Sequence, residues 1–110
     1  MEGKAKEAFK KWFDKKYLDN WNYYNIPENN AIINALTIEW LDSIDIIIEI
    51  GIHQRIGDLN MWRGKINNFI YDDLEFKVSR QEATEAAIKK AVEIYNSKYG
   101  NPQGDPETKQ

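Results

Sequence analysis

Isoleucines at every second position constrain this chain more than any other feature. In the stretch SIDIIIEIGIH they occupy alternate positions from Ile44 to Ile52, while Asp45, Glu49 and His53 have the other parity. Because successive side chains of a strand point to opposite faces, this pattern predicts a strand with one apolar face and one wetter face. The apolar face then needs a partner element to cover it.

The expected cover is the helix SRQEATEAAIKKAVEIYNSKYG, from Ser79 to Gly100. Ser79 suits the N-cap, and Glu82 three positions later completes a capping box. Gly100 suits a left-handed C-terminal cap, and Pro102 prevents continuation. Small and apolar residues form one face of this helix: Thr84, Ala87, Ile88, Ala91, Val92 and Tyr95. The alanines allow such a helix to lie close to a sheet.

Two further strands are expected, one from Met61 to about Tyr71 and one from Leu74 to Val78. Gly57 supplies turn chemistry before the first of them. The three strands should form an antiparallel meander. If its second face stays open, three residues of odd parity would form an apolar patch, which usually marks an interface: Ile47, Met61 and Phe69.

The N-terminal region predicts two helices, an amphipathic one over about residues 3–18 and another over about 30–41. Lysines alternate with aromatic residues in the first. The favoured interpretation is that the aromatic stripe packs on the domain core. The alternative is a surface that binds a partner groove, single-stranded nucleic acid or a membrane surface. The candidate interaction residues are Lys10, Lys11, Trp12, Phe13, Lys15, Lys16, Tyr17 and Trp21.

Length and composition predict one α+β domain over residues 1–100. The expected order is α-α-β-β-β-α, with the helices packed on one face of a three-stranded antiparallel sheet. Residues 101–110 contain no apolar residue and are expected to be disordered. No apolar run approaches the ~20 residues of a membrane span, and no secretory signal is visible, so we expect a soluble, cytoplasmic protein.

The residue types in this chain argue against a catalytic or metal-binding site. The chain has no cysteine, a single histidine and a net charge of −3. There is no Gly-rich phosphate loop and no nucleophile elbow. His53 shares its parity with Glu49, but four residues of strand separate their side chains by about 13 Å. The carboxylates suit turn and cap roles better than a paired acid and base: Asp42, Asp45, Asp72 and Asp73. We therefore expect no enzyme activity, no cofactor and no metal.

The order helix, three antiparallel strands, helix, with SRQEATEAAIKKAVEIY as the last element, resembles the double-stranded RNA-binding domain. In that family, lysines at the start of the final helix grip phosphates across a groove. Carried over, those lysine positions fall on Arg80, Gln81 and Thr84, and Ala83 matches the motif's alanine. One of the three positions is basic, and Glu82 lies beside them.

A second resemblance covers about residues 39–99. EWLDSIDIIIEI followed by SRQEATEAAIKKAVEIYNSKY is similar to small uncharacterised proteins of Bacteroidetes phages and prophages. This resemblance implies a fold and no assigned activity. The expected function is a non-enzymatic phage or mobile-element accessory protein that docks onto a host or phage protein in the bacterial cytoplasm. A nucleic-acid-binding module is the alternative, and self-association stays open.

Overall fold

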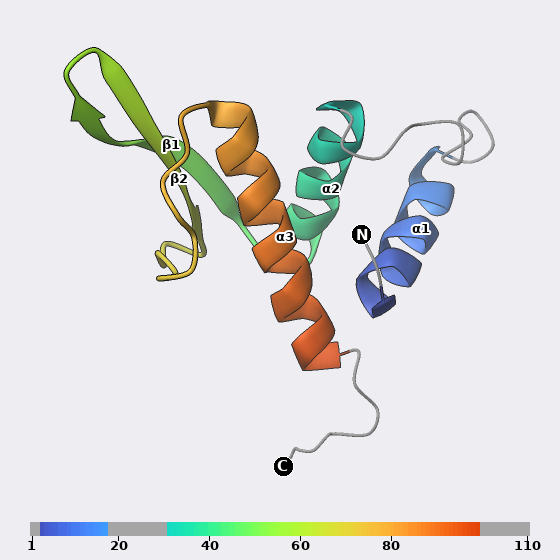
Figure 1. Ribbon diagram of the computed structural model, residues 1–110. Coiled ribbons are helices and arrows are strands. Elements are labelled where there is room, and N and C mark those ends of the chain that lie inside the picture. Colours follow the sequence, from blue (N-terminus) through green and yellow to red (C-terminus); the bar gives the residue numbers. More distant parts are fainter. Residues whose placement is uncertain (1–2, 18–30, 100–110) are drawn as a thin grey trace.

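The computed structural model describes residues 3–17 and 31–99, which form an α+β fold with three helices and a two-stranded antiparallel sheet (Figure 1). The predicted Gly100 cap, the tail 101–110 and Trp21 lie outside these ranges. In chain order the elements are α1 (Gly3–Tyr17), α2 (Ala31–Ser43), β1 (Ile48–Ile56), β2 (Leu59–Ile66) and α3 (Arg80–Tyr99).

Helix α3 lies against the sheet, as its alanines predict. Ala83, Ala87 and Ala91 are buried, and Ala87 faces Gly64 of β2. A Cβ atom built on Gly64 would lie 2.7 Å from the Ala87 Cβ, closer than real Cβ atoms approach. A glycine and an alanine therefore set the short distance between helix and sheet. At the N-terminus of α3, the Glu82 N–H donates to the Ser79 Oγ at 3.1 Å, which confirms the predicted N-cap.

The predicted third strand is not formed. Between residues 67 and 79 the chain makes two isolated antiparallel bridges to β2, one between Ile66 and Phe69 across the turn and one in which Trp62 and Lys77 exchange main-chain hydrogen bonds of 2.7 and 2.8 Å. Strand β2 ends at Ile66 because Asn67 and Asn68 both have positive φ angles, 52° and 66°, and turn the chain. The second strand is thus shorter than predicted.

The first strand was expected around Ile44–Ile52 but spans Ile48–Ile56, so it both begins and ends later than predicted. Helix α2 continues to Ser43, and Asp45, with a φ of 66°, turns the chain, so the strand begins only at Ile48. A β-bulge then interrupts the pairing. Ile52 pairs with Trp62 but Gln54 pairs with Met61, which leaves one extra residue in β1. The extra residue inverts the relation between sequence parity and sheet face.

The core is centred on the helices and not on the isoleucine ribbon. Phe9 and Phe13 of α1 are fully buried, and the Phe9 ring meets Trp40 of α2 edge-on at 5.9 Å. Trp40 in turn meets Tyr95 of α3 at 5.3 Å. Ile48 and Ile50 are half-buried at the base of the sheet, beside α3, whereas Ile52 is exposed toward the far end, which α3 leaves uncovered (Figure 1).

Candidate interaction surfaces

The candidate interaction residues of α1 separate into aromatic residues that pack on the core and lysines that lie toward solvent. Phe13 is fully buried, and Trp12 is half-buried with its ring 5.8 Å from Phe9, so the aromatic stripe packs on the core. The remaining described candidates lie toward solvent to different degrees. Lys10 is half-buried, whereas Lys11, Lys15 and Lys16 are exposed, and the side chain of Tyr17, at the last position of α1, lies outside the described part of the structure.

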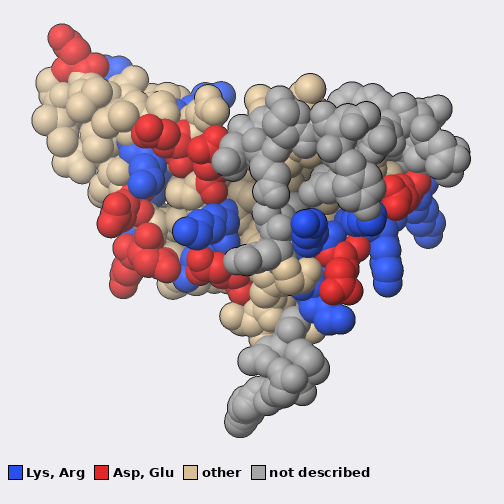
Figure 2. Space-filling view, turned by 45° about the vertical axis from the view of Figure 1, so that its right-hand side comes forward, with Lys and Arg blue, Asp and Glu red and all other residues tan. Residues whose placement is uncertain are grey.

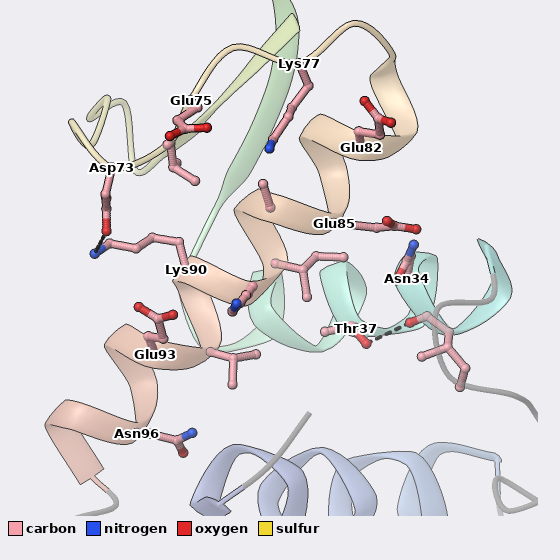
Figure 3. A pocket seen from close by; sticks show the side chains of 16 residues that line it. Asn34, Thr37, Asp73, Glu75, Lys77, Glu82, Glu85, Lys90, Glu93 and Asn96 are labelled. Atoms are coloured by element: carbon pink, nitrogen blue, oxygen red, sulfur yellow. Dashed lines mark hydrogen bonds and ion pairs between the residues drawn. The ribbon is translucent and has the colours of Figure 1, made fainter.

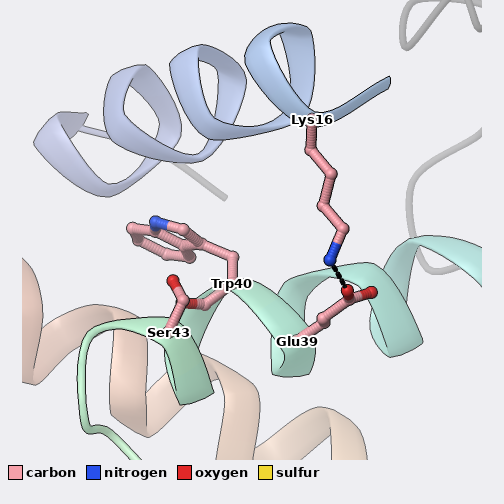
Figure 4. Close-up of polar contacts among 4 residues, drawn as sticks. All are labelled: Lys16, Glu39, Trp40 and Ser43. Carbon is pink, nitrogen blue, oxygen red and sulfur yellow. Dashed lines mark hydrogen bonds and ion pairs between the residues drawn. The ribbon is translucent and has the colours of Figure 1, made fainter.

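Lys16 joins α1 to its neighbour. Its ammonium group makes an ion pair with Glu39 of α2 and lies 5.3 Å from the centre of the Trp12 ring (Figure 4). Near the other end of α1, Lys4 lies 3.7 Å from Glu7, one helical turn away. Both pairs are solvent-exposed, so each contributes little to stability.

The β1–β2 hairpin forms an arm that projects past the first turn of α3 (Figure 1). Its two faces follow from the register. Ile66 is buried and Gly64 faces Ala87, so these residues mark the face that α3 covers. Alternation along β2 places Leu59 and Met61 on the opposite face. Ile56 pairs with Leu59 across the turn and shares that outer face.

Phe76 and Val78, which flank the bridge residue Lys77, extend this outer face. Lys77 bridges Trp62 and lines the groove beside α3, so its neighbours Phe76 and Val78 point the other way. The Arg63 guanidinium lies 4.9 Å from the centre of the Phe76 ring, and His53 at the bulge meets that ring at 6.3 Å. His53 is exposed at this position.

We call this surface the outer patch: Ile56, Leu59, Met61, Phe76 and Val78. Ile56 is 58% exposed, Val78 56%, Leu59 48% and Phe76 38%, and Met61 is partly exposed. The projecting lobe at the upper left of Figure 2 is largely uncharged. Several large apolar side chains therefore share one exposed face.

The patch predicted from sequence parity was placed differently. Ile47 and Phe69 are indeed exposed, at 42% and 57%, but neither belongs to a strand. Phe69 follows the Asn67–Asn68 turn and its ring meets Tyr71 at 4.6 Å. Parity fails beyond the bulge, where Ile56 takes the outer face although its number is even. Only Met61 belongs to both sets.

An open groove of about 1000 Å³ lies between α2, α3 and residues 73–77 (Figure 3). Its walls carry charges of both signs. Lys90 donates a hydrogen bond of 2.8 Å to Asp73. This bond lowers the pKa of the Asp73 carboxyl and raises the pKa of Lys90. Thr37, the buried polar residue of the groove, donates its hydroxyl to the Ile33 carbonyl at 2.7 Å. Within residues 3–17 and 31–99, no group of three acidic or histidine side chains could hold a metal ion.

The positions matched to the RNA-binding motif make contacts within the protein, although Arg80 and Gln81 remain exposed. The Arg80 guanidinium lies 4.9 Å from the centre of the Trp62 ring. Gln81 donates a 3.3 Å hydrogen bond to Glu85, and the Thr84 hydroxyl donates to the Arg80 carbonyl at 2.8 Å. The start of α3 therefore presents no lysine-rich grip.

Comparisons with models of protein families, with curated proteins and with solved structures found no match. In the part of the chain that the structure describes, no helix has the length and apolar character to cross a bilayer.

Proposed function

We propose that this chain is a non-enzymatic interaction protein that docks onto another protein through the outer patch. The observation that carries this proposal is the exposure of several large apolar side chains on one face of a projecting arm. Contiguous apolar surface of this kind is costly to leave in water and usually marks an interface. Burying each such side chain contributes up to about 1.5–3 kcal/mol before the costs of association are subtracted.

The chemistry of the patch favours a protein partner. Phosphate groups and anionic lipids are attracted by cations, and Arg63, the cation that stacks on the patch residue Phe76, is engaged by the protein itself. Its guanidinium donates to the carbonyls of Tyr71 and Leu74 and stacks on Phe76. Asp58, in the hairpin turn, would repel an anion. An exposed apolar face that includes an aromatic ring suits a complementary apolar protein surface.

The resemblance over residues 39–99 supports a biological setting for this docking. In that setting the protein is an accessory factor of a phage or mobile element, its partner is a host or phage protein, and the bacterial cytoplasm is where they meet. No chemistry is required of the protein in this role, because it acts by occupying a surface of its partner.

The proposal is tested by placing one charge in the patch. We expect Leu59→Glu to abolish binding to a partner captured by the wild-type protein and then purified. The matched control is Tyr99→Glu, because Tyr99 is 57% exposed but lies at the end of α3, away from the arm. Binding would be measured by isothermal titration calorimetry, and circular dichroism would check that both variants fold.

Two outcomes would overturn the proposal. One is a partner that binds Leu59→Glu as tightly as it binds the wild-type protein. The other is a wild-type homodimer in light scattering that Leu59→Glu converts to a monomer, because the patch would then serve self-association.

A further inference from the structure

The solvent-exposed face of α1 is charged, whereas the outer patch is apolar. Every exposed residue between Lys4 and Lys16 is charged. Lysines dominate this face, which Figure 2 shows in blue toward the right of the molecule. The exposed residues are Lys4, Lys6, Glu7, Lys11, Asp14, Lys15 and Lys16.

Charge is strongly segregated onto this helix. Helix α1 contains six lysines against Glu7 and Asp14, so its formal charge is 6 − 2 = +4. The whole chain carries −3, so the rest of the sequence carries −3 − 4 = −7. A polyanion approaching this protein therefore meets attraction at α1 and repulsion from the acidic remainder.

Five of the six lysines fall into two rows. At 3.6 residues per turn, Lys4, Lys11 and Lys15 lie along one side of the exposed face, and Lys6 and Lys10 lie along the other. The rise of 1.5 Å per residue separates Lys11 from Lys15 by about 6 Å and Lys4 from Lys11 by about 10 Å along the axis.

The rows are held in place, and three of their lysines are both exposed and without a carboxylate partner in the described part of the chain. The burial of Phe9 and Phe13 fixes the orientation of α1 on the core. Within the described ranges, no carboxylate lies at ion-pair distance from Lys6, Lys11 or Lys15. These three ammonium groups are therefore available to an external anion.

We propose that the lysine face of α1 binds the phosphodiester backbone of nucleic acid without reading its sequence. The face has cations but no exposed apolar residue from Lys4 to Lys16 to anchor a protein, so binding depends on charge and on the release of counterions. The apolar side of α1 is buried, which excludes its insertion into a bilayer in this conformation. This surface is distinct from the start of α3, where the RNA-binding resemblance would place the contact.

The test measures binding by fluorescence anisotropy to labelled duplex DNA, duplex RNA and single-stranded DNA over a range of salt concentrations. We expect affinity for all three that falls steeply with salt. In the double variant Lys11→Gln/Lys15→Gln, affinity at low salt should fall about tenfold, and the slope of log K against log salt should decrease in magnitude by about 2. The control Lys89→Gln/Lys98→Gln removes the same charge from α3 and should leave the slope unchanged.

Three results would overturn this proposal. These are the absence of binding at low salt, an equal loss of affinity in the α3 control, and binding to vesicles of anionic phospholipid without binding to nucleic acid. All the substituted lysines lie on the surface, and circular dichroism would verify that the variants keep the helical content of the wild-type protein. The outcome is independent of the outer patch, since Leu59→Glu should bind nucleic acid as the wild-type protein does.

Discussion

Substituting Gly64 tests the contact that places α3 on the sheet. A methyl group at this position would meet the Ala87 Cβ at 2.7 Å and the Ile50 Cδ1 at 3.1 Å. Because carbon atoms in contact prefer about 3.5–4.0 Å, helix and sheet would have to separate by about 1 Å. Overpacking of this kind costs about 1–3 kcal/mol. Replacing a strand glycine recovers about 0.5–1 kcal/mol of backbone entropy.

We therefore expect Gly64→Ala to lower the free energy of unfolding by about 1–2 kcal/mol. For a domain of this size that loss corresponds to a fall in Tm of about 5–15 °C. The measurement is urea denaturation followed by circular dichroism, with a thermal scan beside it. Gly51→Ala is the matched control, because a Cβ atom there would have no neighbour within 4 Å and the substitution should be neutral or stabilising.

A double-mutant cycle adds a sharper test. Ala87→Gly removes the opposing methyl group, so Gly64→Ala should cost less in that background than in the wild-type protein. A Gly64→Ala variant as stable as the wild-type protein, or a cycle with no coupling, would refute the close-contact argument.

Three further predictions concern the cap, the core and the groove. Ser79→Ala should lower the free energy of unfolding by about 1 kcal/mol in urea denaturation, because the Glu82 amide loses its acceptor, whereas Ser79→Asp should retain stability. Phe13→Ala should cost about 3–5 kcal/mol in the same assay, whereas a value near zero would mean that the side chain is not buried in solution. In an NMR titration, the Asp73 carboxyl should have a pKa below that of an unperturbed aspartate, and Lys90→Gln should raise it. Since the folded-state pKa is the lower one, this pair stabilises the fold above the unfolded-state pKa, and the contribution disappears as pH falls through the folded value.

The helices were predictable because their signals are local. Ser79 and Glu82 lie three residues apart, and the amide-to-hydroxyl bond of the cap depends on nothing else in the chain. The apolar stripe of α1 is likewise a matter of spacing along one helix, and its buried residues Phe9 and Phe13 are four positions apart.

The sheet was less predictable because its shape depends on contacts between distant residues. Leu74, Phe76 and Val78 alternate as in a strand. However, Arg63 donates hydrogen bonds to the carbonyls of Tyr71 and Leu74, and residues 74–78 form only one bridge, between Lys77 and Trp62. The bulge in β1 could likewise not be predicted from composition, because it is a property of how β1 pairs with β2.

The sequence by itself determined which segments become helices, that the segment after α2 becomes a strand, and that lysines concentrate near the N-terminus. Only the tertiary structure decided which apolar side chains meet a partner within the chain. Phe13 is covered because α2 and α3 pack against α1, whereas Ile56 is left in solvent because the bulge in β1 places it on the sheet face opposite α3. Burial depends on elements far apart in sequence. For that reason the sequence pointed to the aromatic residues of α1 as a candidate surface, whereas the structure points to the outer face of the arm.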